Sequence, residues 1–472
     1  MQQYIVRRIG SNRGAPRVYL DTGALVSAGF APGKTYKREV DPEKQRVTLT
    51  IEANGSFVVS RKEKNGHHLP VIDINSTEVL KPFEGMEAVR IVIDQNRILI
   101  LPIASEAKRV ERLQRLKEHL AAGAVTTAGI SFGGGVLDHA AHAGLEQAGI
   151  ASRLAMANEI DEGLLEHTRT HNDVWSSGTI GIAAPMQELV QDDAAMSRLP
   201  RIDILAAGIP CSGASQAGKS KRGISMMEEH PEVGHLAAAA LMVINRIQPA
   251  VVVIENVPQY SDSASACIIR NHLRDSGYNV QETRLNAADF SCLEARKRWF
   301  LVATTRGIEM DLSNLEPVVH VARKIGDILE PIGPDAEDWR TFDYLKTKEV
   351  RDAAKGNCFS MQTITPESSS CPTIRKGYAK GGSTDPLLAH PTHPDLLRPL
   401  TVTEHARIKQ VPEKLVEGLS KTDGHILLGQ GIAYAPVKAL FHRIGQCLRA
   451  WQDSVSEQAS QPVGYSLSRA TG

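Results

Sequence analysis

Long apolar runs mark the centre of the chain. Two of them, residues 202–207 and 249–254, are nearly continuous aliphatic runs, and an Ala-rich stretch at 233–247 separates them. Such runs, bounded by Gly and Pro, are typical of parallel strands buried on both faces, with a helix between them. The same alternation precedes them, with a strand at 126–131 and a helix at 136–148. The pattern predicts an α/β fold on a doubly wound sheet.

Reactive side chains follow the two central runs. Cys211 comes after the first run and Glu255 directly after the second. Because ligand sites of open α/β sheets lie beyond the carboxyl ends of the strands, we expect both residues to open into one crevice. A thiolate is a nucleophile, and a carboxylate after five apolar residues is either hydrogen-bonded in the interior or held at a site with a raised pKa. Each residue alone also fits a purely structural role.

A glycine-rich turn lies upstream. Phe132 and three glycines, residues 133–135, separate the strand at 126–131 from the following helix, and Glu159 follows the next strand. This arrangement brings backbone amides close to a polar ligand, and an acid at the end of a second strand suits ribose hydroxyls. An exposed acid that caps the helix at 162–170 is the alternative.

Residues 1–120 have a different pattern, in which short alternating strands are separated by turn signals. They predict a small β-rich domain, followed by a charged helix at about 105–121. No internal repeat is evident. The expected strands are 17–20, 47–51, 57–60, 88–93 and 98–102.

Three ordered motifs resemble those of the cytosine-5 DNA methyltransferases. They are Pro210-Cys211-x-x-x-Ser215, Glu255-Asn256-Val257 and Glu294-Ala295-Arg296-Lys297-Arg298. Later matches at 398–408 and 428–432 extend the resemblance over about 125–450, in the family's order. The resemblance implies the Rossmann-like fold of S-adenosylmethionine-dependent methyltransferases, with a smaller target-recognition domain; the N-terminal β-rich domain is additional. In the later motif, we expect Thr403 to cap a helix.

The resemblance also implies a mechanism. Cys211 adds to C6 of a cytosine, Glu255 hydrogen-bonds N3, and C5 then attacks the methyl group of S-adenosyl-L-methionine. Arg296 and Arg298 are implied to contact a carbonyl oxygen and a phosphate. Since C6 is inaccessible in a stacked duplex, the base must leave the helix. No metal is expected.

Cofactor contacts are implied for residues of five segments. They are Phe132, Gly133, Gly134, Glu159, Ile160, Thr179, Pro210 and Gln430. Three positions depart from the family pattern: Glu294 replaces a Gln, Thr179 replaces an acid and Gln430 replaces an Asn.

Contacts to double-stranded DNA are expected in two regions. The stretch 212–232 contains basic residues among Gly and Ser, which predicts a mobile lid. The resemblance implies that the interval between Thr305 and Arg398 reads bases. A solvated insert is the alternative for that interval. The candidate DNA contacts are Ser215, Lys219, Lys221, Arg222, Arg375 and Lys376.

These observations divide the chain into parts. The expected divisions are 1–120 as the N-terminal β-rich domain, which could bind DNA; 121–320 as the catalytic domain; 321–397 as the target-recognition domain; 398–450 as the return to the catalytic domain; and 451–472 as a flexible tail.

The amino-acid composition bears on charge and excludes membrane-spanning, zinc-binding and disulfide-rich proteins. The chain has 54 basic and 54 acidic residues, whereas residues 1–120 hold 20 basic and 14 acidic ones. A basic front domain favours nucleic-acid contact or autoregulation, with packing or dimerisation as the alternative. Its layout is similar to the swapped-hairpin DNA-binding domains of some bacterial regulators. The absence of a long apolar run and of Cys-x-x-Cys pairs predicts a cytoplasmic protein without zinc or disulfides. As a protein that acts on DNA, it is expected to associate with the nucleoid; the sequence leaves the oligomeric state open, with a monomer favoured.

Three functions remain open from the sequence. The favoured one is a bacterial or phage DNA cytosine C5 methyltransferase of the restriction-modification type. The others are an RNA cytosine-5 methyltransferase and a catalytically degenerate DNA-binding regulator. Methyl transfer to duplex DNA or to tRNA would separate the first two.

Overall fold

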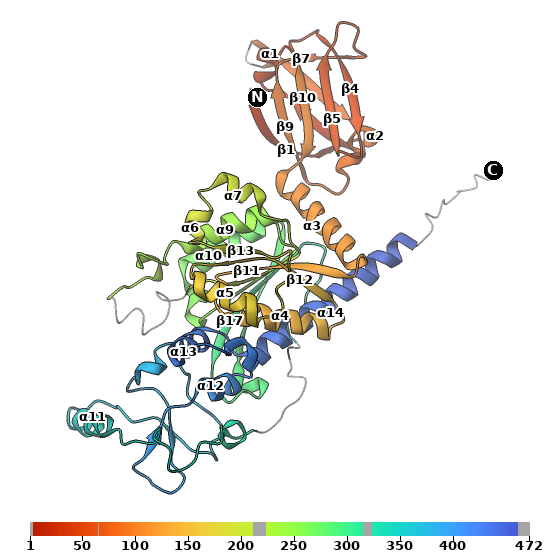
Figure 1. Ribbon diagram of the computed structural model, residues 1–472. Helices are drawn as coiled ribbons and strands as arrows, with labels where there is room; N and C mark the ends of the chain where they lie inside the picture. Colours follow the sequence, from red (N-terminus) through yellow and green to blue (C-terminus); the bar gives the residue numbers. More distant parts are fainter. Residues whose placement is uncertain (1–2, 65, 211–222, 314, 316–322, 461–472) are drawn as a thin grey trace, which may run out of the picture. The chain divides into compact units, whose positions relative to one another are not determined.

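The computed structural model describes residues 3–64, 66–210, 223–313, 315 and 323–460 (Figure 1). The chain forms two compact units, Met1–Glu111 and Arg112–Gly472. Within the described residues, no helix is long and apolar enough to cross a membrane.

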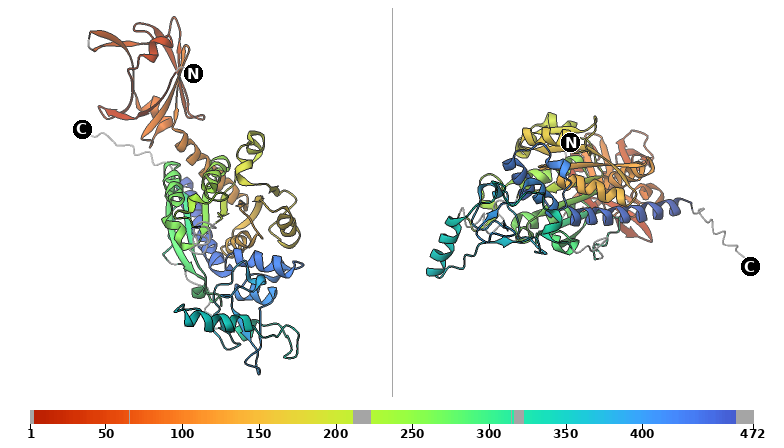
Figure 2. Two further views of the ribbon diagram at one scale, coloured as in Figure 1. Left: turned by 90° about the vertical axis from the view of Figure 1, so that its left-hand side faces the viewer. Right: turned by 60° about the horizontal axis from the view of Figure 1, so that its bottom comes forward.

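The first unit consists of two antiparallel sheets that enclose one core (Figure 2). One sheet has the order β1-β9-β10-β5-β4-β6 and the other β2-β3-β8-β7. Side chains alternate between the core and solvent along the strands, as Val47 and Leu49 do on β5. The bounds are β1 Gln3–Arg8, β2 Gly10–Asn12, β3 Ala15–Leu20, α1 Ala24–Ser27, β4 Thr35–Asp41, β5 Arg46–Ile51, β6 Phe57–Val58, β7 Ser60–Lys64, β8 His67–Asn75, α2 Thr77–Leu80, η1 Lys81–Phe83, β9 Ala88–Asp94 and β10 Arg97–Pro102. Four of the five predicted strands are confirmed, whereas the strand expected at 57–60 is divided at Val59 between β6 and β7, which belong to different sheets.

The first unit contains an internal duplication, so the expectation of no repeat is wrong. The order β1-β2-β3-α1-β4-β5 recurs as β6-β7-β8-α2-η1-β9-β10. Buried positions correspond in the two copies, such as Val18 with Ile72 and Leu20 with Ile74. The sequence does not show this repeat because mainly the apolar pattern is shared, and the spacing between matching residues shifts along the copies.

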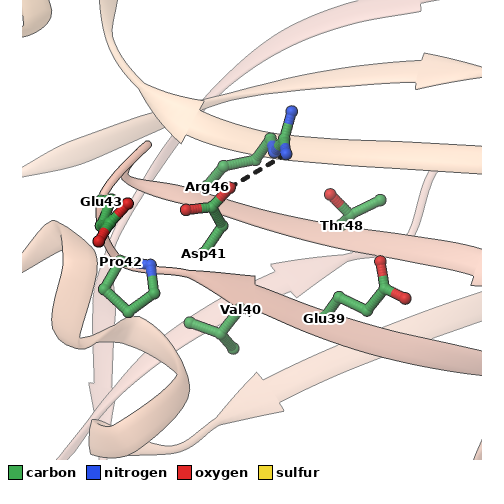
Figure 3. Close-up of a pocket in the computed structure, with 7 residues that line it drawn as sticks. All are labelled: Glu39, Val40, Asp41, Pro42, Glu43, Arg46 and Thr48. Carbon is green, nitrogen blue, oxygen red and sulfur yellow. Dashed lines mark hydrogen bonds and ion pairs between the residues drawn. The ribbon is translucent and has the colours of Figure 1, made fainter.

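Charged residues gather at the turn that joins β4 to β5. There, Glu39, Asp41 and Glu43 line an open pocket of about 660 Å³ (Figure 3). Two of these acids have cationic partners, since Arg46 Nη2 lies 3.2 Å from the Asp41 carboxylate and Lys37 Nζ lies 3.2 Å from Glu39 Oε1. The pocket is therefore lined by charges of both signs.

The second unit is built on a seven-stranded sheet with the order β13-β12-β11-β14-β15-β17-β16. Six strands run in the same direction, and β17 is antiparallel to both of its neighbours, β15 and β16. The bounds are β11 Ala124–Ile130, β12 Ala151–Glu159, β13 Ile180–Ala183, β14 Ile204–Gly208, β15 Val251–Asn256, β16 Tyr278–Asn286 and β17 Lys297–Thr305. The order reverses at β11 and β14, as the doubly wound prediction requires.

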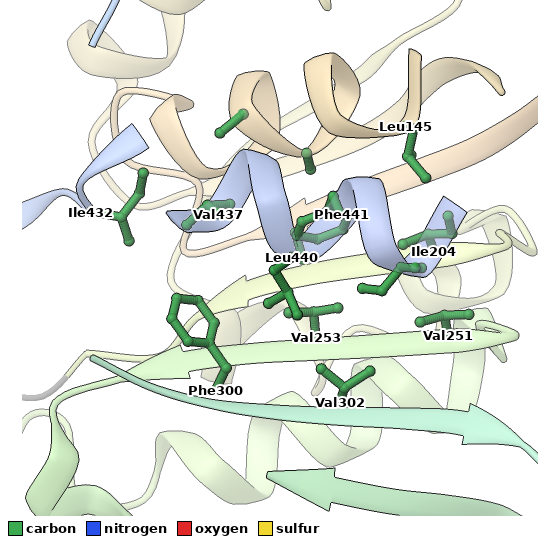
Figure 4. Packing of buried hydrophobic residues seen from close by; sticks show 14 of the residues in the cluster. Leu145, Ile204, Val251, Val253, Phe300, Val302, Ile432, Val437, Leu440 and Phe441 are labelled. Atoms are coloured by element: carbon green, nitrogen blue, oxygen red, sulfur yellow. The ribbon is translucent and has the colours of Figure 1, made fainter. Parts of the chain in front are cut away.

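Helices cover both faces of this sheet. Val251 and Val253 of β15 belong to the core on the α14 side, whereas Val252 and Ile254 belong to the core on the opposite side. Figure 4 shows the first core, in which Phe441 and Leu440 of α14 pack over the strands. The helices are α4 Val136–Gln147, α5 Glu162–His171, α6 Met186–Leu189, α7 Asp193–Arg198, η2 Met227–Glu229, α9 Leu236–Ile247, η3 Pro258–Asp262, α10 Ala264–Asp275, η4 Ala287–Phe290 and α14 Tyr434–Ser460. Because α14 continues to Ser460, the residues from 451 onward that we expected in a tail begin as helix.

Helix α3, Ala104–Ala121, confirms the predicted charged helix, and its second half is anchored in the second unit. Arg112 is fully buried and donates to Thr305 Oγ1 at 3.0 Å and Gln248 Oε1 at 2.8 Å. Its guanidinium also stacks 4.1 Å from the ring of Tyr278. These contacts hold the helix at the end of the sheet where the parallel strands begin, and the fully buried Leu116 packs into the same core as α14.

The remaining residues form short elements around a small core of their own. Thr401 caps α12 and forms a capping box with Glu404, so the predicted cap at Thr403 is wrong by two residues. The reason is that Glu404 stands three residues after Thr401, the spacing that a capping box needs. The elements are η5 Ile325–Ile328, α11 Asp343–Ala354, β18 Thr363–Ile364, η6 Tyr378–Lys380, β19 Leu387–Ala389, β20 Leu397–Arg398, α12 Val402–Ile408, η7 Glu413–Val416 and α13 Lys421–Gln430.

Candidate active site

The carboxyl ends of β14 and β15 lie side by side. Gly208 is paired in register with Glu255, so the chain that leads to Cys211 departs opposite the carboxylate. Asn256 ties the two strands together, since its Nδ2 donates to the Ile209 carbonyl at 3.1 Å. Cys211 itself lies outside the described residues. The structure thus places the approach to Cys211 and the side chain of Glu255 at one edge of the sheet.

Glu255 is held by Arg298 of the neighbouring strand. Arg298 Nε lies 2.8 Å from Glu255 Oε1, and the two side chains are 16% and 13% exposed. The pair is therefore partly shielded from water but still reachable. A carboxylate fixed through one oxygen can present the other oxygen to a ligand.

The side chain of Arg296, two residues earlier, lies at the end of α13 and not beside Glu255. It is 3% exposed, and its Nη2 donates to the carbonyl oxygens of Gly429 at 3.0 Å and Gln430 at 3.4 Å. A cation at the carboxyl end of a helix is favourable because the last carbonyls have no partner within the helix. Arg296 consequently secures the end of α13, and its implied contact with substrate stays a prediction.

A buried acid, Glu294, and a buried base, Lys409, lie close to Arg296. Glu294 Oε2 is 3.9 Å from Lys409 Nζ, and both side chains are fully buried. Glu294 Oε1 also accepts from the Ile374 amide at 2.9 Å and lies 3.4 Å from Arg296 Nη1. The family's Gln is thus replaced here by an acid that has two cationic neighbours.

Lys409 links this cluster to the end of α13. Its ammonium donates to the carbonyls of Leu428 and, at 2.9 Å, Gly431. Burial holds the pKa of Lys409 well below its usual value; the charge of Arg296 acts in the same direction and Glu294 opposes it. Sequence reasoning missed this residue. The available signal was weak, a single Lys directly after the apolar Ile408 at the end of a helical stretch.

The glycine turn presents amides to Glu159. Gly133 N–H donates to Glu159 Oε2 at 2.7 Å, and the amides of Ile160 and Asp161 donate to Oε1 at 3.0 and 3.2 Å. Gly133 has a φ of +56°, and a Cβ there would meet no heavy atom within 4 Å. The turn therefore leaves space in front of a fixed carboxylate.

An aliphatic surface adjoins that space. Ile160 is 65% exposed although it is a large apolar residue. Next to a carboxylate, such a surface suits a ribose and the face of a planar base. The residues at this place fit a nucleoside group.

Other predicted cofactor residues have structural contacts. Phe132 is 4% exposed, and its ring packs edge-on to Trp175 with centroids 6.0 Å apart. Thr179 Oγ1 donates to the Leu154 carbonyl at 2.7 Å and accepts from the Ser176 amide at 3.0 Å. These residues brace the walls of the site. Gly134 packs against Leu427 of α13, and Pro210 is half-buried.

The end of α13 also contacts the segment that contains two predicted DNA contacts. A Cβ at Gly429 would lie 2.3 Å from the backbone nitrogen of Lys376, so only glycine fits there. Lys376 and Arg375 are exposed, and Arg375 Nη2 lies 3.2 Å from Asp385 Oδ1. Gln430, the last residue of α13, is exposed beside them.

The other predicted DNA contacts, Ser215, Lys219, Lys221 and Arg222, lie outside the described residues. Of the stretch 212–232, only 223–232 is described, and there Glu228 Oε1 accepts from the Ser265 amide at 2.8 Å. The described residues contain no cluster of side chains that could hold a metal ion, and their cysteines are free.

Comparison with known proteins agrees with this geometry. The sequence matches the family of C-5 cytosine-specific DNA methylases over residues 139–446. The Type II methyltransferase M.NlaX from Neisseria lactamica is 27% identical over 317 residues, which are 66% of this chain and 94% of that protein. M.MspI from Moraxella sp is 26% identical over 275 residues, which are 56% of this chain and 60% of that protein.

Solved structures support the fold. The S. pombe Dnmt2 methyltransferase matches with a TM-score of 0.54 and 20% identity, over 69% of this chain and 99% of that one. The Entamoeba histolytica methyltransferase EhMeth matches with a TM-score of 0.51 and 15% identity, over 68% and 98%. With a family match over more than half of its length and the predicted fold in place, this chain belongs to the C-5 cytosine-specific DNA methylase family.

Proposed function

We propose that this protein transfers a methyl group from S-adenosyl-L-methionine to C5 of a cytosine in double-stranded DNA. The observation that supports this most strongly is the Glu255–Arg298 pair, which lies opposite Gly208, three residues ahead of Cys211. A nucleophile and a positioned carboxylate at one sheet edge are what a poorly nucleophilic ring carbon needs.

In the proposed reaction, the Cys211 thiolate forms a bond to C6 of the cytosine. Glu255 provides a proton at N3, which makes C6 electrophilic, and when the thiolate adds to C6 the electron pair of the C5–C6 double bond makes C5 nucleophilic. S-Adenosyl-L-methionine would supply an electrophilic methyl group and leave as S-adenosyl-L-homocysteine. After methyl transfer, the C5 proton passes to solvent, the double bond forms again as the thiolate is expelled, and the proton at N3 returns to Glu255, so the enzyme is regenerated.

Arg298 has a positioning role in this scheme. Its ion pair to one oxygen of Glu255 fixes the other toward the base without consuming it. Rigid placement of a proton-handling group contributes substantially to catalysis, because little reorganisation is then needed in the transition state.

The cofactor would be bound at the glycine turn. Glu159 would accept hydrogen bonds from the ribose hydroxyls through lone pairs that its three backbone amides leave, and Ile160 would pack against the adenine. The open space at Gly133 provides the close approach to backbone that such a ligand needs.

The DNA would be bound on the side of Arg375 and Lys376. Both are exposed, and their backbone abuts Gly429 at the end of α13, which Arg296 and Lys409 secure from within. We therefore propose residues 321–397 as the target-recognition segment, with phosphate contacts from these cations.

Methyl transfer from radiolabelled S-adenosyl-L-methionine tests the proposal. Duplex DNA should become labelled at cytosine C5, and tRNA should not. The variant C211A should lose transfer while it retains DNA binding. Equal labelling of tRNA, or full activity of C211A, would contradict the proposal.

A further inference from the structure

The two copies in the first unit are arranged like the subunits of a symmetric dimer. The pairings between them are reciprocal: β1 pairs with β9 as β6 does with β4, while β3 pairs with β8 and β5 with β10. Contacts in which each element meets its own equivalent imply a two-fold axis. A single chain therefore carries a pseudo-two-fold axis.

The register locates that axis. Tyr19 and Asp73 occupy equivalent positions, each between two buried aliphatic residues, and they face each other in the β3–β8 pairing. Thr48 and Leu99 are equivalent in the same way and face each other in the β5–β10 pairing. The axis passes through both pairs.

Positive charge gathers on the corresponding parts of the two copies. Residues 3–20 and 57–75, which form β1–β3 and β6–β8, contain seven Lys or Arg and two Asp or Glu. The rest of the two copies, residues 21–56 and 76–102, contains eight Lys or Arg and nine Asp or Glu. We call the first two segments the basic arms. The basic character is thus shared by equivalent elements and is absent from the remainder.

Several of these charges face solvent. Arg8, Arg13 and Arg61 are exposed, and so are His67 and His68. Arg13 and Gly14 have φ of +51° and +79° in the turn between β2 and β3, and Gly66 has a φ of +76° in the equivalent turn between β7 and β8. Because β3 and β8 are antiparallel, the two turns lie at opposite ends of their sheet.

An aromatic ring flanked by cations lies at the axis between the arms. The Arg17 guanidinium is 4.8 Å and the Lys62 ammonium 5.4 Å from the centre of the Tyr19 ring. Arg17 is held by two hydrogen bonds of 2.8 Å to Asp73. Lys62 Nζ lies 2.5 Å from Asp21 Oδ2, so each of these two cations is paired with a carboxylate and the axis has a polar surface that carries charges of both signs.

From the reciprocal pairing and the charge, we infer that the first unit binds double-stranded DNA of two-fold symmetric sequence. The basic arms would contact phosphates on either side of the axis, where an inverted repeat presents equivalent groups. This would be a second DNA site, separate from the one that receives the cytosine. It would bring the enzyme to particular loci or let it bind its own regulatory sequence.

Selection from a pool of random duplexes tests this inference with the full-length protein. Bound sequences should be enriched in an inverted repeat. The variant R8A/R13A/R61A should bind that repeat at least about tenfold more weakly. The slope of log affinity against log salt should also become shallower, by about 0.9 for each phosphate that the protein no longer neutralises.

Two control variants make the result decisive. K34A/K44A/K81A removes three exposed cations of the same unit outside the basic arms, and R8K/R13K/R61K keeps the charge; both should bind the repeat like the unaltered protein. Methyl transfer to a short duplex without the repeat should be unchanged in all three variants, which separates this inference from the methyltransferase activity. The inference would be overturned if the enriched sequences lacked two-fold symmetry, or if R8A/R13A/R61A and K34A/K44A/K81A lost affinity for the repeat equally. Competition by single-stranded RNA as effective as that by the repeat itself would also overturn it.

Discussion

Arg298 Nε and Glu255 Oε1 lie 2.8 Å apart on adjacent antiparallel strands, at the sheet edge where the chain turns toward Cys211. The two side chains are mostly buried, so solvent screens their attraction only in part. We therefore regard the pair as the fixed element of the catalytic site.

Replacing Arg298 should uncouple catalysis from DNA binding. In R298A, Glu255 loses its partner and its fixed orientation, so kcat should fall by about 10²-fold, the scale of a misplaced proton-handling group. R298K should recover part of the loss, and the Kd for duplex DNA should change little. Single-turnover methyl transfer and gel shifts would measure both; a purely higher Kd would show that Arg298 contacts phosphate instead.

The buried pair of Glu294 and Lys409 should show strong energetic coupling. E294Q removes a negative charge that opposes the lowering of the Lys409 pKa, so the charged form of this buried side chain becomes less favourable. The change should cost up to about 3–5 kcal/mol of stability, the range found for breaking a buried pair. The double variant E294Q/K409Q should cost much less than the sum of the two single variants. Urea unfolding of all four proteins gives the coupling; additive losses would mean that the two residues do not interact.

Cofactor affinity should depend on Glu159. E159A removes the acceptor that faces the open glycine turn, and it should weaken binding of S-adenosyl-L-methionine about 10–100-fold, equivalent to the loss of one or two charge-assisted hydrogen bonds. Titration calorimetry without DNA measures this directly. The variant D161N, a change at the neighbouring acid that caps α5, should bind the cofactor almost normally. Unchanged affinity in E159A would place the cofactor elsewhere.

Acid should destabilise the second unit through His142. Burial lowers the pKa of this residue to about 4, while its ring nitrogens contact the Thr127 and Ser152 hydroxyls at 2.8 and 2.9 Å. The His142 side chain of the unfolded chain takes up a proton near pH 6.5, whereas that of the folded chain does so only near pH 4. The stability that the neutral, buried His142 contributes is therefore fully present above pH 6.5 and is lost as the pH falls toward 4. The loss should be at most about 3 kcal/mol. Unfolding between pH 7 and 4.5 should show a weaker dependence on pH in H142N; an identical dependence would assign the effect to other groups.

Much of the fold was readable from the sequence because two buried strands leave long apolar runs. The runs at 202–207 and 249–254 indicated β14 and β15, and Glu255 stood out because an acid directly after buried residues needs a partner. Its partner Arg298 was expected, together with Arg296, to contact a carbonyl oxygen and a phosphate, since spacing along one motif does not reveal pairing across a sheet.

The parts that could not be predicted depend on contacts between distant residues. Lys409 is 115 positions from Glu294, and only the folded chain brings this Lys, which follows helix α12, close to an acid of another segment. The duplication in residues 1–102 could not be predicted from the sequence for a related reason. Two antiparallel sheets need only an alternating apolar pattern, and many different residues satisfy that pattern. The paired strands make the repeat evident.

The most direct test of the central claim is covalent capture on duplex DNA that contains 5-fluorocytosine. Fluorine at C5 cannot leave as a proton, so after methyl transfer the bond between Cys211 and C6 should persist. We predict a protein–DNA band that survives denaturing electrophoresis for the unaltered protein and for C267A, in which an exposed cysteine is removed, but not for C211A. A covalent band from C211A, or none from the unaltered protein under conditions where it methylates normal DNA, would contradict the account.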